Sequence, residues 1–165
     1  MNFWRMQLHP DDSENAVAHT VKSLGLGYIG LDFANPPGDL TDVDAADIPK
    51  SQRDYWDFAH RMKVGDFVLI VAHHYPCALV EIIGEYNYIR KPECDLGVWF
   101  RHFRKVKPVG FYSDFVTNPA NWQKTIMTDT ISILNSTDSA YVGSSLVFCL
   151  FDEIVRRVKS CLLPF

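Results

Sequence analysis

Two apolar runs in the middle of the chain limit what it can fold into. Phe67–Ala72 and Ala78–Gly84 are separated by five residues, among them His73, His74 and Tyr75. Runs this short and this apolar are typical of strands that lie in the interior of a sheet. A gap of five residues suits a hairpin connection. The two runs therefore predict a hairpin at the centre of a sheet.

Strands and helices are predicted on the N-terminal side of this hairpin. Phe3–Leu8 alternates as a strand does, and residues 25–33 form a second strand flanked by glycines. Between them, capping residues at 11–13 predict a helix that ends near Leu24. Residues 35–49, which contain three prolines and four aspartates, form a loop. A second amphipathic helix follows, because four apolar residues share one helical face: Tyr55, Phe58, Ala59 and Met62.

The C-terminal half contains one more strand and further helices. Gly97–Lys107 alternates, but both of its faces mix apolar and charged residues. A strand of this kind is typical of a barrel edge that a ligand can approach, although an ordinary curved strand has the same pattern. Helices are expected over Asn121–Leu134 and along an apolar stripe from Val147 to Val158. The chain is thus predicted to be α+β, a single domain over residues 1–165, with residues 111–165 as a mostly helical cap.

Composition places this domain in a reducing compartment. The 165 residues have no signal-like start, no run long enough to span a bilayer and four cysteines without Cys-x-x-Cys spacing. We therefore expect reduced thiols and a cytoplasmic protein that does not bind membranes.

The charge is unevenly distributed along the chain. The net charge is −4, and residues 1–50 hold eight acidic against three basic residues. Residues 51–110 hold seven acidic and nine basic residues, including a cluster without an acidic neighbour. This cluster is predicted to contact phosphates, the alternative being an ordinary solvated strand face. Its members are Arg101, His102, Arg104 and Lys105.

Motifs for catalysis are scarce. The sequence has no Gly-x-x-x-x-Gly-Lys-Ser/Thr loop for a nucleotide and no Glu-x-Lys of a metal-dependent nuclease. His73 and His74 are adjacent, so on a strand they point to opposite faces and cannot readily bind one ion. We expect no metal or other cofactor. A hydrolase that uses His73, His74 or His102 stays open as an alternative.

An ordered series of segments resembles a known superfamily. The first are Phe3-Trp4-Arg5-Met6, Gly27-Tyr28-Ile29-Gly30-Leu31-Asp32-Phe33 and Gly38-Asp39-Leu40. The later ones are Met62-Lys63-Val64-Gly65-Asp66-Phe67-Val68, Ile83-Gly84-Glu85-Tyr86 and Arg101-His102-Phe103-Arg104-Lys105-Val106. The series is similar to the PUA-like superfamily, in particular its EVE and YTH branches and the N-terminal domains of McrB-type restriction systems. The resemblance covers about residues 1–110 and rests on the order of segments.

This resemblance implies a small, strongly curved β-barrel with flanking helices that holds a modified base in an aromatic pocket. Such a pocket needs rings to stack on the base and a polar group to read its edge. Asp32 is the preferred edge reader, the alternative being a carboxylate that caps the following loop. The alternative for each ring is a place in the core, where aromatic side chains more often lie. The candidate pocket residues are Trp4, Tyr28, Asp32, Phe33, Tyr75 and Trp99.

The leading hypothesis is a non-enzymatic module that recognises a modified base in DNA or RNA, in a defence or restriction setting. No effector domain is apparent, so a nuclease or NTPase would act in trans. The acidic N-terminal third departs from the usual basic character of such readers. A second hypothesis is a protein-interaction or assembly subunit with a degenerate pocket, anchored by its apolar tail, Cys161–Phe165.

Overall fold

The structure of the protein is a computed structural model that describes residues 1–8, 15–33, 35–72, 75–93, 100–111 and 129–134. The chain divides into two compact units, Met1–Ile133 and Leu134–Phe165. Nearly all described residues belong to the first unit. The expected helical cap over 111–165, the stripe from Val147 to Val158 and the Cys161–Phe165 tail lie largely or wholly outside the described residues.

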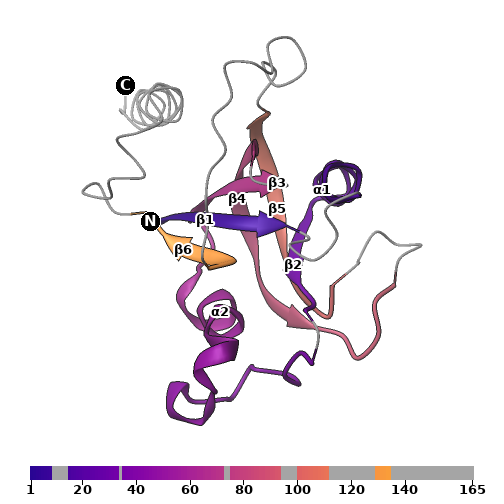
Figure 1. Cartoon of the computed structure of the whole chain (residues 1–165). Helices are drawn as coiled ribbons and strands as arrows, with labels where there is room; N and C mark the ends of the chain where they lie inside the picture. Colours follow the sequence, from indigo (N-terminus) through magenta and orange to yellow (C-terminus); the bar gives the residue numbers. More distant parts are fainter. Residues whose placement is uncertain (9–14, 34, 73–74, 94–99, 112–128, 135–165) are drawn as a thin grey trace. The chain divides into compact units, whose positions relative to one another are not determined.

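Six strands form one mixed sheet in the order β2-β5-β4-β3-β1-β6 (Figure 1). β1 pairs with β3 in parallel, and the other neighbouring strands are antiparallel. The central hairpin is confirmed, because β3 has the predicted bounds and pairs with β4, which contains the second apolar run. The strands are β1 (Phe3–Leu8), β2 (Tyr28–Leu31), β3 (Phe67–Ala72), β4 (Tyr75–Tyr88), β5 (His102–Phe111) and β6 (Ile131–Ile133).

Among the described residues, the sheet does not close into a barrel. Its ends are β2 and β6, and no strand pairing joins them. The α+β class is confirmed, and the closed barrel is wrong, because end strands of four and three residues offer too few backbone groups for closure. The pairing register shifts at three places, once between β3 and β4 and twice between β4 and β5. Irregularities of this kind bend strands and increase their twist.

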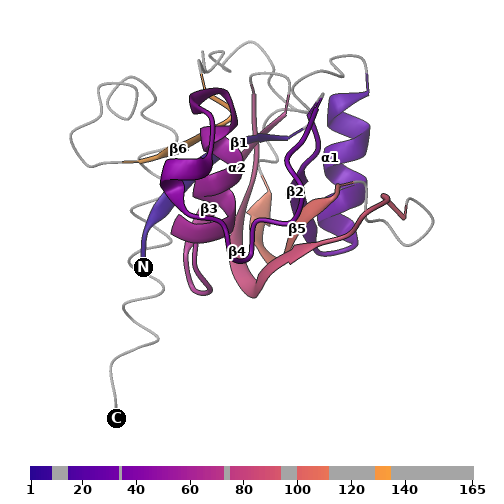
Figure 2. The same cartoon turned by 90° about the horizontal axis from the view of Figure 1, so that it is seen from below.

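Helices lie at two places along the sheet. Figures 1 and 2 show α1 (Ala16–Gly25) beside β2 and β5, and α2 (Arg53–Trp56) towards the β6 end. α2 continues into a π-helical turn, η3 (Asp57–Arg61), and follows two short 3₁₀ turns, η1 (Ala45–Asp47) and η2 (Lys50–Gln52). The predicted apolar face is confirmed, since its four members are buried: Tyr55, Phe58, Ala59 and Met62.

The turn between η3 and β3 fixes the start of the chain. Gly65 has φ of 86°, a left-handed conformation that favours glycine. Beside it, the buried carboxylate of Asp66 accepts hydrogen bonds from the Asn2 and Lys63 amides and from Trp4 Nε1, at 2.6, 3.1 and 3.0 Å. This carboxylate therefore ties β1 to the turn that precedes β3.

The two faces of β5 differ sharply in burial. His102, Arg104 and Val106 are 0%, 1% and 2% exposed, whereas Lys105 and Lys107 are exposed. The alternation predicted over Gly97–Lys107 is thus confirmed from His102 to Lys107, but one of its faces is an interior face despite a histidine and an arginine. A charged group is tolerated in an interior only when its hydrogen bonds are supplied there.

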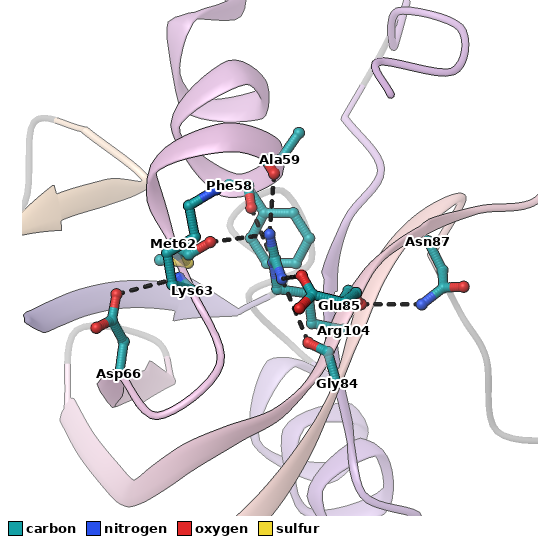
Figure 3. A network of polar contacts seen from close by, with 9 residues as sticks. All are labelled: Phe58, Ala59, Met62, Lys63, Asp66, Gly84, Glu85, Asn87 and Arg104. Carbon is teal, nitrogen blue, oxygen red and sulfur yellow. Dashed lines mark hydrogen bonds and ion pairs between the residues drawn. The ribbon is translucent and has the colours of Figure 1, made fainter. Parts of the chain in front are cut away.

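The guanidinium group of Arg104 has such partners, and they join the helical layer to the sheet. Its Nε donates to the carbonyl of Phe58 at 2.9 Å, and Nη2 donates to those of Ala59 and Met62, both at 2.9 Å. Nη1 donates to the carbonyl of Gly84 in β4 at 3.3 Å. Figure 3 shows the side chain reaching from β5 to the end of η3. The last carbonyls of a helix lack hydrogen-bond donors within the helix, and the Arg104 guanidinium group supplies these donors.

The predicted helix over Asn121–Leu134 is wrong where it can be checked. Ile131–Ile133 form β6, which pairs antiparallel with β1 from Trp4 to Met6. The β-branched isoleucines suit a strand edge, and pairing with β1 decides the local structure there. Residues 121–128 lie outside the described part. Within the described residues, no helix is long and apolar enough to cross a bilayer.

We predict that Arg104→Met strongly destabilises the protein. The substitution leaves three buried carbonyls at the end of η3 without a donor, and each unpaired group costs about 1–3 kcal/mol. The free energy of unfolding, measured by urea denaturation, should fall by at least about 3 kcal/mol. The exposed neighbour Lys105 gives a matched control. Lys105→Met should change the free energy of unfolding by no more than about 0.5 kcal/mol. Equal effects of the two substitutions would contradict the assigned role of Arg104.

Candidate functional site

Three strand ends meet at one edge of the sheet. β5 runs antiparallel to β2 and β4, so the last residues of those strands, Leu31 and Tyr88, both lie opposite the first residue of β5, His102. Residues just beyond β2 and just before β5 extend this edge. We call the following residues the strand-end cluster: Asp32, Phe33, Tyr55, Tyr86, Tyr88, Arg101 and His102.

Aromatic rings surround His102 in this cluster. Its ring centroid lies 4.7 Å from that of Tyr55, 5.0 Å from Tyr88 and 6.0 Å from Tyr86. Phe33 continues the series by an edge-to-face contact with Tyr55 at 5.2 Å. Tyr55 and His102 are buried, whereas Phe33, Tyr86 and Tyr88 are half-buried. The cluster is therefore an aromatic patch with a closed interior and an accessible rim.

Hydrogen bonds fix the protonation pattern of His102. Nε2 lies 3.1 Å from the carbonyl oxygen of Pro37, which only accepts, so Nε2 carries the proton. Nδ1 of the neutral ring then accepts from the Tyr86 hydroxyl at 2.8 Å. The same hydroxyl oxygen accepts from the Leu40 amide at 3.2 Å. The result is a directed chain from Leu40 through Tyr86 and His102 to Pro37.

Burial keeps the side chains of His102 and Tyr86 neutral. Desolvation lowers the pKa of His102 to about 4, and the Pro37 hydrogen bond opposes it only in part. Desolvation likewise raises the pKa of Tyr86 to about 12. At neutral pH the His102 imidazole and the Tyr86 phenol are therefore both uncharged. The directions of their hydrogen bonds do not change.

This series of hydrogen bonds anchors the loop that follows β2. Besides the bonds at Pro37 and Leu40, the Tyr55 hydroxyl accepts from the Phe33 amide at 2.5 Å. His60 Nε2 donates to the Leu40 carbonyl at 2.7 Å, and the Leu40 side chain is buried. The loop from Phe33 to Leu40 is thus held against the aromatic patch at both of its ends.

A carboxylate and a guanidinium group lie side by side at the rim. Arg101 Nε is 3.2 Å from Asp32 Oδ1, and the two side chains are 38% and 16% exposed. Neither of these two atoms makes a well-aligned hydrogen bond with any described residue. Burial is the larger influence on Asp32 and raises the pKa of its carboxyl, while Arg101 acts in the opposite direction. The pair is held by charge, and both of these atoms are buried.

Of the predicted pocket residues whose side chains the structure describes, Asp32 and Phe33 both belong to the strand-end cluster. Trp4 is 1% exposed and bonded to Asp66, so its assignment to the pocket is wrong; it belongs to the core. Tyr28 lies on the opposite face of the β2–β5 pair, where it contacts Phe103 edge-on at 5.7 Å. The Tyr75 side chain and the whole of Trp99 lie outside the described residues, as do His73 and His74.

The predicted phosphate-binding cluster is divided between the two faces of β5. Lys105 lies on the accessible face and Arg101, just before β5, is 38% exposed, and the phosphate-binding role of both stays a prediction. The assignment is wrong for His102 and Arg104, because strand alternation turns both inward, where hydrogen bonds to carbonyls hold them. The same burial leaves His102 no access to a substrate as a hydrolytic base.

Sequence reasoning missed three members of the strand-end cluster: Tyr55, Tyr86 and Tyr88. The last two share one face of β4 because they are two residues apart. This Tyr-x-Tyr spacing at the end of an apolar run was a usable signal. The contact of Tyr55 with His102 was not, because it joins a helix to a strand across 47 residues. Within the described residues, no group of three His, Cys, Asp or Glu side chains could hold a metal ion.

The low pKa of His102 predicts a specific dependence of stability on pH. The unfolded chain takes up a proton near pH 6.5 and the folded chain only near pH 4, so protonation favours unfolding between these values. The contribution of His102 to stability is fully present above about pH 6.5 and declines as the pH falls towards 4. Urea denaturation should show a smaller decline for His102→Gln, which keeps a neutral donor. Identical declines in wild type and variant would contradict a buried neutral imidazole.

Comparisons with known proteins give a family and a coarse structural likeness. No curated protein matches the chain. Three similar solved structures are the MmI1 YTH domain, a Zygosaccharomyces rouxii MRB1 YTH domain in complex with N6-methyladenosine RNA, and a Leishmania major hypothetical protein. Their identities are 14%, 11% and 12%, with TM-scores of 0.44, 0.45 and 0.43. The matches cover 94%, 86% and 86% of this chain and 99%, 83% and 92% of those chains.

The likeness to YTH domains is at low identity and carries no residue role. The EVE and McrB-type branches stay predictions. One family model matches most of the chain, from residue 4 to residue 135. The chain belongs to the family described as a domain of unknown function, DUF8426.

Proposed function

We propose that the chain is a binding module that holds an unpaired nucleobase at the rim of the strand-end cluster. The observation that carries this proposal is the Asp32–Arg101 ion pair, whose two residues directly precede Phe33 and His102 of the aromatic patch in the sequence. A nucleobase has two π-faces and an edge of donors and acceptors. The π-faces of such a ligand match the aromatic rings of the site, and its hydrogen-bonding edge matches the Asp32–Arg101 pair.

Each part of the site has a distinct task in this proposal. Phe33 or Tyr88 stacks on the base, because both rings are half-buried and lie next to the buried pair Tyr55 and His102. Base–aromatic stacking contributes about 1–3 kcal/mol per base. The loop that bears Phe33 is already anchored, so little conformational entropy is lost when a base binds.

The ion pair reads the edge of the base. The contact of Asp32 with Arg101 joins Oδ1 to Nε. In this proposal Oδ2 accepts a hydrogen bond from the base and the terminal Nη atoms donate to it. Adenine and cytosine both carry an exocyclic amine next to a ring nitrogen that accepts, so either complements this arrangement. Uracil and guanine present a carbonyl there, which would face the Asp32 carboxylate unfavourably.

A modified base fits the same arrangement. A methyl group on the base would contact the aromatic rim, and such a contact distinguishes a methylated from a plain base by about 1–3 kcal/mol. DNA or RNA that carries the modified base is then the partner, with a nuclease or NTPase acting in trans. The site uses no covalent step, so the protein is proposed to be a reader and not an enzyme.

Nucleoside titration tests the proposal. Isothermal calorimetry should show adenosine or cytidine and their methylated forms binding more tightly than uridine. Phe33→Ala should weaken this binding roughly five- to 150-fold through lost stacking. Asp32→Ala should abolish the preference for amine-bearing bases.

Asp42→Asn is the matched control, because this exposed carboxylate lies in the same acidic segment but outside the cluster. Circular dichroism checks that each variant is folded. Equal affinities for all nucleosides in wild type, or unchanged binding in both cluster variants, would refute the proposed site.

A further inference from the structure

The face of β5 that looks away from His102 carries its own set of side chains. Strand alternation places Phe103, Lys105 and Lys107 in one row. Residues two apart on a strand are about 6.7 Å apart, so this row extends for roughly 13 Å. Arg101, the cation of the strand-end cluster, lies just before the start of β5.

An aromatic pair lies in the middle of this row. Tyr28 of β2 is directly opposite Lys105 in the register and contacts Phe103 edge-on at 5.7 Å. Both rings are half-buried. Gly30 is the residue opposite Phe103, and the buried side chain of Phe100 packs over it.

The cations of the row differ in their acidic neighbours. Lys105 is exposed, lies opposite Tyr28 on one side and packs its stem against Gly84 on the other. The β4 segment between Ile82 and Tyr86, which lies across from Lys105, also contains Glu85, whose carboxylate is 3.9 Å from Arg104 Nη1. Lys107 is exposed as well and lies opposite Glu81.

We infer that Tyr28, Phe103, Lys105 and Lys107 form a second surface, the β5 outer row, which binds a single-stranded nucleic acid next to the base site. The inference rests on the proposed function and specifies its ligand as a polymer with unpaired flanking nucleotides. Aromatic rings between cations suit single strands, because rings stack on exposed bases while lysines contact phosphates. In a duplex the base faces are already stacked and cannot reach Tyr28 or Phe103.

The test compares a mononucleotide with an oligonucleotide of about eight nucleotides. Titrations should be made between about 50 and 200 mM salt, with the single strand and with its duplex. In wild type the single strand should bind at least roughly tenfold more tightly than both the mononucleotide and the duplex. The double variant Lys105→Gln/Lys107→Gln removes two phosphate contacts, so the slope of log affinity against log salt should shrink by about 1.4.

Variants separate this surface from the base site. Lys105→Gln/Lys107→Gln should leave mononucleotide binding unchanged, and Phe103→Ala should weaken only the oligonucleotide, roughly five- to 150-fold. The charge-matched control Lys50→Gln/Lys63→Gln changes two exposed lysines that flank α2 and η3. This control variant should leave the slope of log affinity against log salt unchanged.

The outcomes distinguish failure of this inference from failure of the proposed function. If mononucleotides bind but single strands bind no more tightly, or the control variant acts like Lys105→Gln/Lys107→Gln, the outer row is not a binding surface. Equal affinity for single strand and duplex would also overturn it. If mononucleotides do not bind at all, the base site fails, whatever the lysine variants show.

Discussion

The buried guanidinium group of Arg104 is the interaction on which the rest of the structure depends. It lies between the sheet and η3 and donates to three carbonyls at the end of the helical turn and one in β4. The same helical segment supplies Tyr55 and His60, which hold the two ends of the loop after β2. The position of η3 on the sheet therefore determines where that loop lies, and with it the rim of the strand-end cluster.

Strand alternation and burial together explain the arrangement of the site. His102 and Arg104 face inward on β5 and are satisfied by carbonyls, so they organise the protein and do not contact solvent. Arg101 and Lys105 face the other way and stay accessible. One short basic stretch of sequence thus provides both internal support and external charge. The neutral state of His102 keeps the loop anchors unchanged at neutral pH.

Local patterns predicted most of the elements, and long-range pairing decided what they missed. The bounds of β1 and β3 and the apolar face of α2–η3 follow from periodicity that short segments contain. β6 was missed because pairing with β1, more than 120 residues away in sequence, creates it. Of the site, Asp32 was found because it ends a predicted strand, and Phe33 because the resemblance calls for aromatic rings. Trp4 and Arg104 were misassigned because composition does not reveal that Asp66 and the η3 carbonyls would satisfy them internally.

The central claim is that an unpaired base lies against the rim of the strand-end cluster. The most direct measurement is an NMR experiment on the full chain with a ¹³C-labelled nucleoside, which detects contacts between base protons and protein side chains. The account predicts nuclear Overhauser effects from the base to the rings of Phe33 or Tyr88 and to the side chain of Arg101. Contacts confined to other parts of the surface, or none at saturating nucleoside, would contradict it.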